Sequence, residues 1–268
     1  MSEPLDRLVR LVATLRESCP WDREQTFDTL QTYLLEETHE VLDALASAEP
    51  AALRGELGDL LFQIFFLSRI ATERGWFGID DVASSIEAKM IARHPHVFGA
   101  ERAEDAEAVK ANWEKRKRRD AAGGDPLAGI PKGLPALSAA FRMSERAADL
   151  GFDWERDADL LEKVAEEVDE AREAARGGKD RATEAELGDL LFALANWARR
   201  RRIDPERALR LANSKFRRRF GAIAERARAD GKDVSECGAG ELDGYWNAVK
   251  AQERALDPPD GPGVPRER

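Results

Sequence analysis

The sequence predicts an all-α protein made of two tandem helical modules. Apolar residues recur at helical spacing along most of the chain, and no segment shows the alternation of apolar and polar residues that is typical of a half-buried strand. The heptapeptide Glu-Leu-Gly-Asp-Leu-Leu-Phe at residues 56–62 recurs letter for letter at residues 186–192, about 130 positions later. A segment rich in glycine and proline separates the two copies, as expected of a linker.

These features place four segments along the chain. We expect an N-terminal module at residues 1–120, a Gly/Pro-rich linker at residues 121–135 and a C-terminal module at residues 136–256. The tail at residues 257–268 is dominated by proline, glycine and charged residues, so we expect it to be disordered.

The first module is predicted to contain five helices. The first covers residues 3–18 and ends at a Cys-Pro-Trp-Asp segment, because proline disfavours helix at the residue before it. The second begins at Asp28 or Thr29 as its N-cap. The third, at residues 51–73, is apolar nearly all the way round, so we expect it to be buried on most sides against a partner subunit or the sister module. The last two helices are expected at residues 80–93 and 105–119.

The second module repeats this series. A Gly-Phe-Asp-Trp segment stands where the first module has Cys-Pro-Trp-Asp. The basic runs Arg116–Arg119 and Arg199–Arg202 do not recur in register between the modules, so they are interpreted as solvated faces. The helices of this module are expected at residues 141–150, 160–176, 183–202, 205–228 and 241–254.

Composition excludes several classes of function. The net charge of −10 argues against a general nucleic-acid binder, because a phosphate backbone attracts the opposite charge. The two cysteines, Cys19 and Cys237, provide neither a disulfide framework nor a zinc site. No segment approaches the roughly 18 uninterrupted apolar residues of a membrane span, and the N-terminus lacks the apolar core of a signal peptide. We therefore expect a cytoplasmic protein with no membrane partner.

Each module carries a second acidic pair on the helix that precedes the heptapeptide. In the first module this pair is Glu37 and Glu40, which share a helix face because they are three residues apart. The heptapeptide adds Glu56 and Asp59 at the same spacing. A short connection makes the two helices antiparallel neighbours, so the four carboxylates are expected to converge. The corresponding set in the second module is Glu167, Glu170, Glu186 and Asp189.

Such a set of acids predicts a metal site. Carboxylates gathered near an apolar core need either raised pKa values or a counterion. Their hard oxygen atoms suit Mg²⁺, with Mn²⁺ as a substitute, and Mg²⁺ held in this way usually binds substrate phosphates. One acidic pair is common on a solvated helix, but two pairs at hairpin spacing in both modules favour a site. Gly58 and Gly188 interrupt the same helices, at a cost of about 1 kcal/mol relative to alanine, and predict a close helix approach.

A phosphate site also needs cations, and both modules offer basic and aromatic residues at a repeated four-residue spacing. Lysine supplies a point charge, arginine a bidentate fork, and tryptophan a face for a base or ribose. The candidates in the second module are Lys215, Arg219, Trp246 and Lys250. Their counterparts in the first module are Lys89, Arg93, Trp113 and Lys117.

With these motifs in place, the chain resembles the MazG family of tandem-domain nucleoside triphosphate pyrophosphohydrolases, within the all-α NTP pyrophosphatase superfamily. The resemblance covers about residues 5–255. It rests on the paired Glu-Glu-x-x-Glu and Glu-x-x-Asp motifs and on the segments Cys-Pro-Trp-Asp, His-Pro-His-Val-Phe and Gly-Phe-Asp-Trp.

The resemblance implies Mg²⁺-dependent hydrolysis of NTPs or dNTPs to the monophosphate and pyrophosphate, a house-cleaning of the nucleotide pool. It also implies broad base tolerance and a homodimer in which each module contributes to a four-helix-bundle-type core. In this family the C-terminal module is the one best supported as active, so its four acids would bind magnesium and its cations and tryptophan would contact nucleotide. The first-module set is complete, so metal binding is expected there, and whether that module turns over stays open, as do the base preference and a link to an alarmone.

The expected reaction is attack of water on the α-phosphorus with metal assistance. Lys215 and Arg219 would stabilise charge on the leaving pyrophosphate, and Lys163, one turn before the acidic pair, is a further candidate for the phosphates. Glu166 directly precedes the first ligand, so it is our candidate for the group that orients or deprotonates the water.

Two other functions fit parts of the sequence. A ferritin-like di-iron site would use the Glu-x-x-His formed by Glu36 and His39, but such sites need two of these motifs and the second module has Asp169 in place of the histidine. A non-catalytic nucleotide-binding protein or helical adaptor would leave the acids as solvated faces. Nucleotide and Mg²⁺ would stabilise the enzyme against unfolding and would not stabilise the adaptor.

Overall fold

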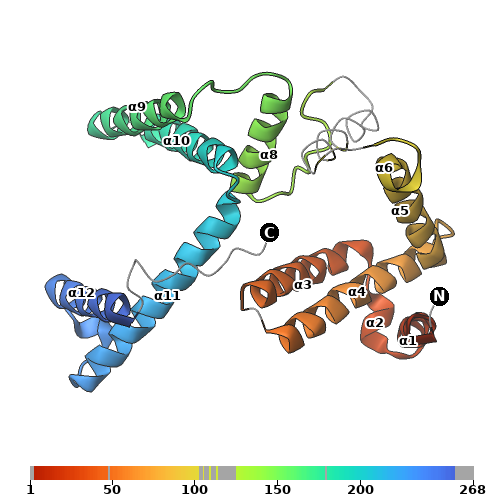
Figure 1. Cartoon of the computed structure of the whole chain (residues 1–268). Coiled ribbons are helices and arrows are strands. Elements are labelled where there is room, and N and C mark those ends of the chain that lie inside the picture. Colours follow the sequence, from red (N-terminus) through yellow and green to blue (C-terminus); the bar gives the residue numbers. More distant parts are fainter. Residues whose placement is uncertain are drawn as a thin grey trace. The chain divides into compact units, whose positions relative to one another are not determined.

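The structure, a computed structural model, describes residues 3–47, 49–102, 105, 109, 113, 125–178 and 180–256. Over these residues the chain is helical and has no strand, so the predicted all-α class is confirmed. The chain divides into two compact units, Met1–Asp120 and Ala121–Arg268 (Figure 1). None of the described helices is long and apolar enough to cross a membrane.

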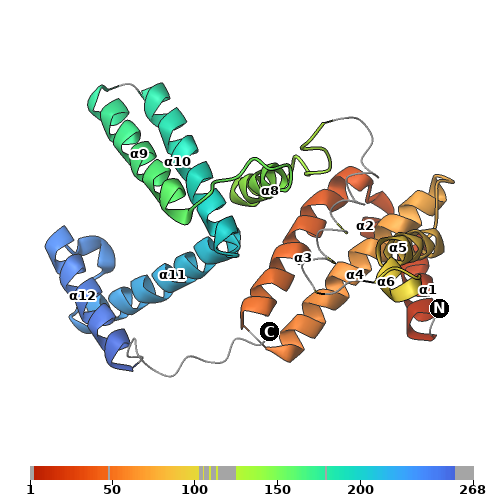
Figure 2. The same cartoon turned by 45° about the horizontal axis from the view of Figure 1, so that its top comes forward.

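A helical hairpin and its supporting helices make up the described part of the first unit. Its elements are α1 (Glu3–Ser18), α2 (Pro20–Glu24), α3 (Phe27–Ser47), α4 (Pro50–Glu73), α5 (Ile79–Arg93) and α6 (Pro95–Phe98). Helices α3 and α4 lie side by side along most of their length in both views (Figures 1 and 2). Helix α1 packs against α4, and α2 packs against α1.

The core of this unit forms where α1 and α3 meet the C-terminal half of α4. Phe66 is its largest fully buried side chain, and Val12 and Leu30 are nearly as inaccessible. Phe65 and Ile70 complete the buried cluster. Because these residues come from three helices, the core fixes the hairpin and α1 as one unit.

Hydrogen bonds define where two of these helices begin. Thr26 is the residue before α3, and its Oγ1 accepts a hydrogen bond from the Thr29 backbone N–H at 3.2 Å, while the Thr29 hydroxyl accepts from Thr26 N–H at 2.8 Å. This reciprocal pair is a capping arrangement, so the expected cap at Asp28 or Thr29 was wrong by two or three residues. Before α5, Gly78 N–H donates to Asp81 in the same way, at 2.8 Å.

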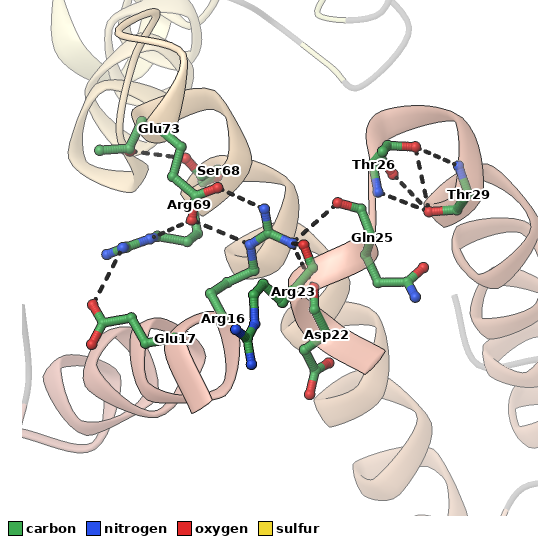
Figure 3. Close-up of polar contacts among 11 residues, drawn as sticks. Arg16, Glu17, Asp22, Arg23, Gln25, Thr26, Thr29, Ser68, Arg69 and Glu73 are labelled. Atoms are coloured by element: carbon green, nitrogen blue, oxygen red, sulfur yellow. Dashed lines mark hydrogen bonds and ion pairs between the residues drawn. The ribbon is translucent and has the colours of Figure 1, made fainter. Parts of the chain in front are cut away.

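Arg16 on α1 joins this helix to α2 and to the end of α4 (Figure 3). Its guanidinium donates to both carboxylate oxygens of Glu73 at the end of α4, at 3.2 and 2.6 Å. It also donates to the backbone carbonyls that close α2, those of Asp22, Arg23 and Gln25. Because the last carbonyls of a helix lack partners within the helix, this one side chain satisfies several of them.

The second unit is also a hairpin with supporting helices. Its described elements are α8 (Ala136–Asp149), α9 (Asp157–Arg176), α10 (Asp180–Arg200), α11 (Pro205–Ala229), the 3₁₀ turn η1 (Val234–Glu236) and α12 (Ala239–Leu256). Helices α9 and α10 pair along their length, α8 packs against α10, and α11 pairs with α12 (Figures 1 and 2). Asp204 caps α11 by accepting from Arg207 N–H at 3.0 Å.

The first two arginines of the run Arg199–Arg202 end α10 and are not the solvated residues that we expected. Arg199 contacts Asp153 at 2.5 Å, and Arg200 contacts Asp157 at 2.7 Å. The Arg200 guanidinium also donates to the Trp154 carbonyl. These contacts fasten the Gly-Phe-Asp-Trp segment to the end of α10, whereas Arg201 and Arg202 are exposed, as expected of the run.

Helix boundaries differ from the expected ones mainly near proline. Residues 20–24 and 95–98 form short helices after prolines that were expected only to end helices, because proline suits the first position of a helix. Helix α8 begins at Ala136 rather than at Phe141. The predicted helix at 105–119 falls almost wholly outside the described residues, as do Lys117, the run Arg116–Arg119 and the tail 257–268.

The N-terminal halves of the heptapeptide helices are largely exposed in the single chain, so the burial against a partner or sister module that we expect of the helix at 51–73 stays a prediction. Leu57 on α4 and Leu187 on α10 are about half exposed, with 49% and 50% of their surfaces accessible. A Cβ atom placed on Gly58 or Gly188 would meet nothing within 4 Å, so the close helix approach expected there is absent within the described chain. Burial of these helices is confined to their C-terminal halves.

Candidate metal and nucleotide site

Three carboxylates meet between α3 and α4 in the first unit. Glu37 comes from α3, and Glu56 and Asp59 come from α4, where their three-residue spacing puts them on one face. One oxygen from each lies within 4.8 Å of the others. The hairpin therefore brings together acids from two helices, as the sequence predicted.

The second unit repeats this cluster between α9 and α10. Glu167, Glu186 and Asp189 again offer oxygens within 4.8 Å of one another. Glu167 is the most enclosed of these acids, with only 6% of its surface exposed. The two clusters thus occupy matching places in the two hairpins.

The fourth acid of each predicted set lies just outside the tight group. Glu40 lies close enough to Glu56 for its charge to raise the pKa of that carboxyl. Glu170 lies close enough to Glu167 and Glu186 to be repelled by both. Each is therefore placed at the edge of the cluster, one helical turn beyond the acid that faces α4 or α10.

Burial and mutual repulsion raise the pKa values of several carboxyl groups in the clusters. Burial, followed by repulsion from Asp59 and Glu40, raises the pKa of Glu37 above its usual value. Burial and the same kind of repulsion raise the pKa of Glu56, and burial raises that of Glu170. Groups held in this way favour a proton or a cation, which lowers their mutual repulsion.

The donor set fits a hard divalent cation. Carboxylate oxygens are the ligands that Mg²⁺ and Mn²⁺ prefer, and a cluster of three with exposed members such as Asp59 and Asp189 leaves room for water or phosphate oxygens. A zinc site would need the nitrogen or sulfur ligands that neither cluster contains. Glu36 and His39, the pair behind the di-iron alternative, are outside both clusters.

The two clusters differ in their immediate neighbours. In the second unit Lys163 contacts Glu166 at 3.0 Å and Glu167 at 2.9 Å, and these carboxylates raise the pKa of the Lys163 ammonium. In the first unit the Gln63 amide hydrogen-bonds Glu37 and acts to lower the pKa of that acid. Gln63 is 7% exposed, and its Oε1 has no hydrogen-bond partner.

The predicted nucleotide-binding residues of the second unit gather on α11 and α12. The Arg219 guanidinium lies over the Trp246 ring, 5.5 Å from its centroid, and Phe216 packs against the same ring at 5.7 Å. Glu253 binds Arg219 at 2.7 Å. Lys215 is exposed, and Lys250 is half-buried. An aromatic face and a cation therefore meet here.

The first unit has a related arrangement at the end of α5. Arg93 lies over the Trp113 ring at 5.4 Å, and the His94 ring meets Trp113 edge-on at 4.8 Å. Lys89 is exposed one turn earlier on α5. In the second unit, no contact among the described residues joins Lys215, Arg219 or Lys250 to the acidic cluster, so the acids and these cations form separate groups there.

Comparison with known proteins identifies the family. A family model described as the MazG nucleotide pyrophosphohydrolase domain matches this chain twice, at residues 25–98 and 156–222. Each match contains one acidic cluster. The chain belongs to the MazG family.

Relatives of known name are similar to this chain over most of their length. A protein of Escherichia coli (strain K12) named nucleoside triphosphate pyrophosphohydrolase is 43% identical over 257 residues, which cover 93% of this chain and 98% of the relative. A Thermotoga maritima protein named nucleoside triphosphate pyrophosphohydrolase/pyrophosphatase MazG is 41% identical over 253 residues, 91% of this chain and 95% of the relative. A nucleoside triphosphate pyrophosphohydrolase of Mycolicibacterium smegmatis is 35% identical over 218 residues.

One residue beside the MazG clusters escaped the sequence interpretation. Gln63 lies four positions after Asp59 on α4, so helix periodicity alone places it on the acidic face. A comparison of the two MazG domains would have drawn attention to it, because Ala193 stands at the corresponding position in the second. Its contact with Glu37 could be seen only in the folded hairpin.

Proposed function

We propose that this MazG protein hydrolyses NTPs or dNTPs to the monophosphate and pyrophosphate in an Mg²⁺-dependent reaction, and so clears the nucleotide pool. The observation that carries the proposal is the convergence of Glu167, Glu186 and Asp189 within 4.8 Å, duplicated by Glu37, Glu56 and Asp59. The names of the relatives from E. coli and T. maritima support the same reaction.

Four acids would hold the metal in the second module. Glu167, Glu186 and Asp189 supply oxygens from the tight group, and Glu170 is close enough to join them. The bound cation would polarise phosphate oxygens and offset the charge on the leaving pyrophosphate. In the first module, Glu37, Glu40, Glu56 and Asp59 are the corresponding proposed ligands.

Other side chains of the second module would bind and orient the substrate. Lys163 sits beside the acidic group and is placed to meet a phosphate, and Lys215 and Arg219 would bind the charge of the triphosphate. Trp246 offers its ring to the base or ribose, with Lys250 beside it on α12. Lys89, Arg93, Trp113 and Lys117 are the proposed equivalents in the first module.

Glu166 is proposed to orient the attacking water and take its proton. Its carboxylate is more exposed than that of Glu167 and is held by Lys163 at 3.0 Å. The water oxygen would form the new bond to the α-phosphorus, and the bond from that phosphorus to the bridging oxygen would break. The electron pair leaves with pyrophosphate, and the proton moves to the Glu166 carboxylate.

A homodimer is proposed as the assembly that completes the site. Leu187 and Leu191, four residues apart on α10, are about half exposed, and so is Leu57 on α4; exposed apolar residues on one helix face are typical of an interface. Among the described residues of one chain, no contact joins Lys215, Arg219 or Lys250 to the acids of α9 and α10. A second copy would both cover the apolar faces and supply the missing neighbours.

The deciding experiment measures pyrophosphate release by the full-length protein against a panel of NTPs and dNTPs, with and without Mg²⁺. Glu186→Gln/Asp189→Asn and Glu56→Gln/Asp59→Asn form a matched pair, since each removes the same two acids from one module. Loss of turnover in one or both variants, with helical circular dichroism retained, supports the proposal. Full pyrophosphate release by the quadruple variant would refute it and favour a helical adaptor.

A further inference from the structure

The two acidic clusters have the same geometry but opposite electrostatic surroundings. Four residues before the first acid, the second module has Lys163 and the first has Tyr33. Four residues after the last acid, the second module has Ala193 and the first has Gln63. Both differences concern helix positions one turn away from acids of the clusters.

In the second module the most enclosed carboxylate already has a counterion. Lys163 Nζ lies 2.9 Å from Glu167 Oε1, and the Glu167 side chain is 7% exposed. A divalent cation that approaches this oxygen is repelled by the ammonium at short range, and it must displace a charge-assisted hydrogen bond. Binding of metal alone is therefore opposed until another anion takes up the ammonium.

A triphosphate is an anion that can do so. Lys163 is one-third exposed, so its head group can turn from Glu167 to a phosphate without unfolding of α9. The cation and the nucleotide then help each other: the phosphates hold Lys163, and Glu167 is released to the metal. Two ligands that each favour the same arrangement bind with positive coupling.

The first module lacks this internal counterion. Tyr33 is uncharged and packs edge-on against Trp21, and no ion pair joins Glu37, Glu56 or Asp59 to a lysine or arginine in the part of the chain that the structure describes. Three carboxylates with oxygens within 4.8 Å of one another therefore stand here without a cationic side chain from the described residues between them.

Gln63 gives an independent sign that a ligand belongs in this cluster. Its amide contacts Glu37, and its Oε1 is buried with no partner, although buried acceptors are nearly always paired. An amide oxygen is a suitable ligand for Mg²⁺ or Mn²⁺, either directly or through a bound water. Glu56, Asp59 and Gln63 are spaced by three and four residues and so share one face of α4, which makes the Gln63 oxygen a candidate further ligand for a cation held by the three acids.

We propose that the first-module cluster binds Mg²⁺ or Mn²⁺ in the absence of nucleotide, with the help of Gln63. The second-module cluster binds its cation only together with a nucleotide, because Lys163 remains paired with Glu167 until a phosphate binds the lysine. This division of roles rests on the proposed metal function of both clusters. One chain would then contain two copies of the acidic motif, one that binds a metal ion without substrate and one that binds it together with substrate.

The test counts Mn²⁺ bound to the full-length protein by electron paramagnetic resonance, first alone and then with a non-hydrolysable NTP. We expect one tight Mn²⁺ per chain without nucleotide and a second when the analogue is added. Glu56→Gln/Asp59→Asn should abolish the nucleotide-independent ion, and Glu186→Gln/Asp189→Asn should leave it unchanged. Glu56→Gln alone is the substitute if the first double variant loses its helical circular dichroism.

Two single variants test the causes separately. Lys163→Met should create a second nucleotide-independent site and strengthen Mn²⁺ binding there about tenfold, because the repelling charge on a partly exposed side chain is removed. Gln63→Leu should weaken binding in the first module about tenfold, as loss of an outer-shell partner commonly does.

Two results would overturn the proposal while leaving the enzyme function intact: two sites of equal affinity without nucleotide, or loss of the tight ion in the Glu186→Gln/Asp189→Asn variant. An unchanged second-module affinity in Lys163→Met would equally refute the role of that lysine. No bound Mn²⁺ in either arm would instead refute the proposed metal function itself.

Discussion

Replacing Arg16 by methionine should destabilise the first unit while leaving the second unit unchanged. The Arg16 side chain is only 11% exposed, and it binds Glu73 and three backbone carbonyls of the segment that contains α2. Removing one partner of a buried ion pair costs about 3–5 kcal/mol. Glu73 is one-third exposed and keeps a second partner, Arg69 at 2.9 Å, so we expect a smaller loss of about 2–3 kcal/mol.

Native-state hydrogen exchange, read by mass spectrometry, measures this loss in each unit separately. A decrease of about 2–3 kcal/mol corresponds to roughly a 30- to 150-fold loss of amide protection in α1 and α4. Protection in α9 and α10 serves as the internal control. Arg7→Met is the matched variant, because Arg7 pairs with Glu3 on the exposed face of α1 and its loss should cost under about 0.5 kcal/mol.

The Arg16–Glu73 ion pair also predicts how the stability of the first unit depends on pH. Hydrogen bonds from Arg16 hold the pKa of Glu73 below its usual value of 4.5. The stabilisation is therefore complete above that value and is lost as the pH falls through the lower pKa of the folded state. Arg16→Met should flatten this part of the stability profile. Equal effects of Arg16→Met and Arg7→Met on protection would refute the reasoning.

Three further predictions concern the second unit. Glu186→Gln/Asp189→Asn should lower pyrophosphate release from this module at least about 100-fold, as measured at saturating Mg²⁺, because two proposed ligands are lost. Tyr245 donates to Asp230, which raises its pKa to about 12, so its absorbance at 295 nm should titrate in that range and return toward 10 in Asp230→Asn. Gly188→Ala should stabilise α10 by about 1 kcal/mol in thermal unfolding, because the added Cβ meets nothing within 4 Å. If the substitution instead dissociates a dimer, Gly188 lies at the interface between the two subunits.

Helix periodicity and the repeated heptapeptide were enough to predict most of the fold. The predicted helix at 3–18 coincides with α1, and the predicted helix at 51–73 differs from α4 by a single residue at its start. The boundaries near Cys19 and His94 were harder, because proline can end one helix and begin the next, and the choice depends on tertiary contacts. Around Cys19 those contacts come from Arg16. Its hydrogen bonds to the carbonyls of Arg23 and Gln25 could not be predicted from the neighbouring sequence.

The acidic clusters were predictable to a similar degree. Three-residue spacing on two antiparallel helices specifies which acids face each other, and the structure brings together three of each predicted four. What the spacing could not specify was the immediate electrostatic partner. Lys163 reaches Glu167, and Gln63 reaches Glu37, because of side-chain directions within a packed hairpin.

Sequence reasoning failed where long-range ion pairs decide the outcome. Arg199 and Arg200 looked like members of a solvated basic run, yet their partners lie 46 and 43 residues earlier, at Asp153 before α9 and at Asp157, its first residue. Likewise, glycine in a helix interior suggested a tight contact at Gly58, whereas the space beside it is open. Neither outcome follows from local pattern, since each depends on which segments the fold brings into contact.

The hairpin that carries each acidic cluster also has a consequence for the order of folding. All members of a cluster come from two helices that are adjacent in the chain and joined by a short connection. Contacts that are local in sequence form early, since little loop-closure entropy opposes them. During synthesis the first hairpin can therefore assemble its ligand set while the second module is still being translated, so the two clusters become available to cations at different moments in the life of the chain.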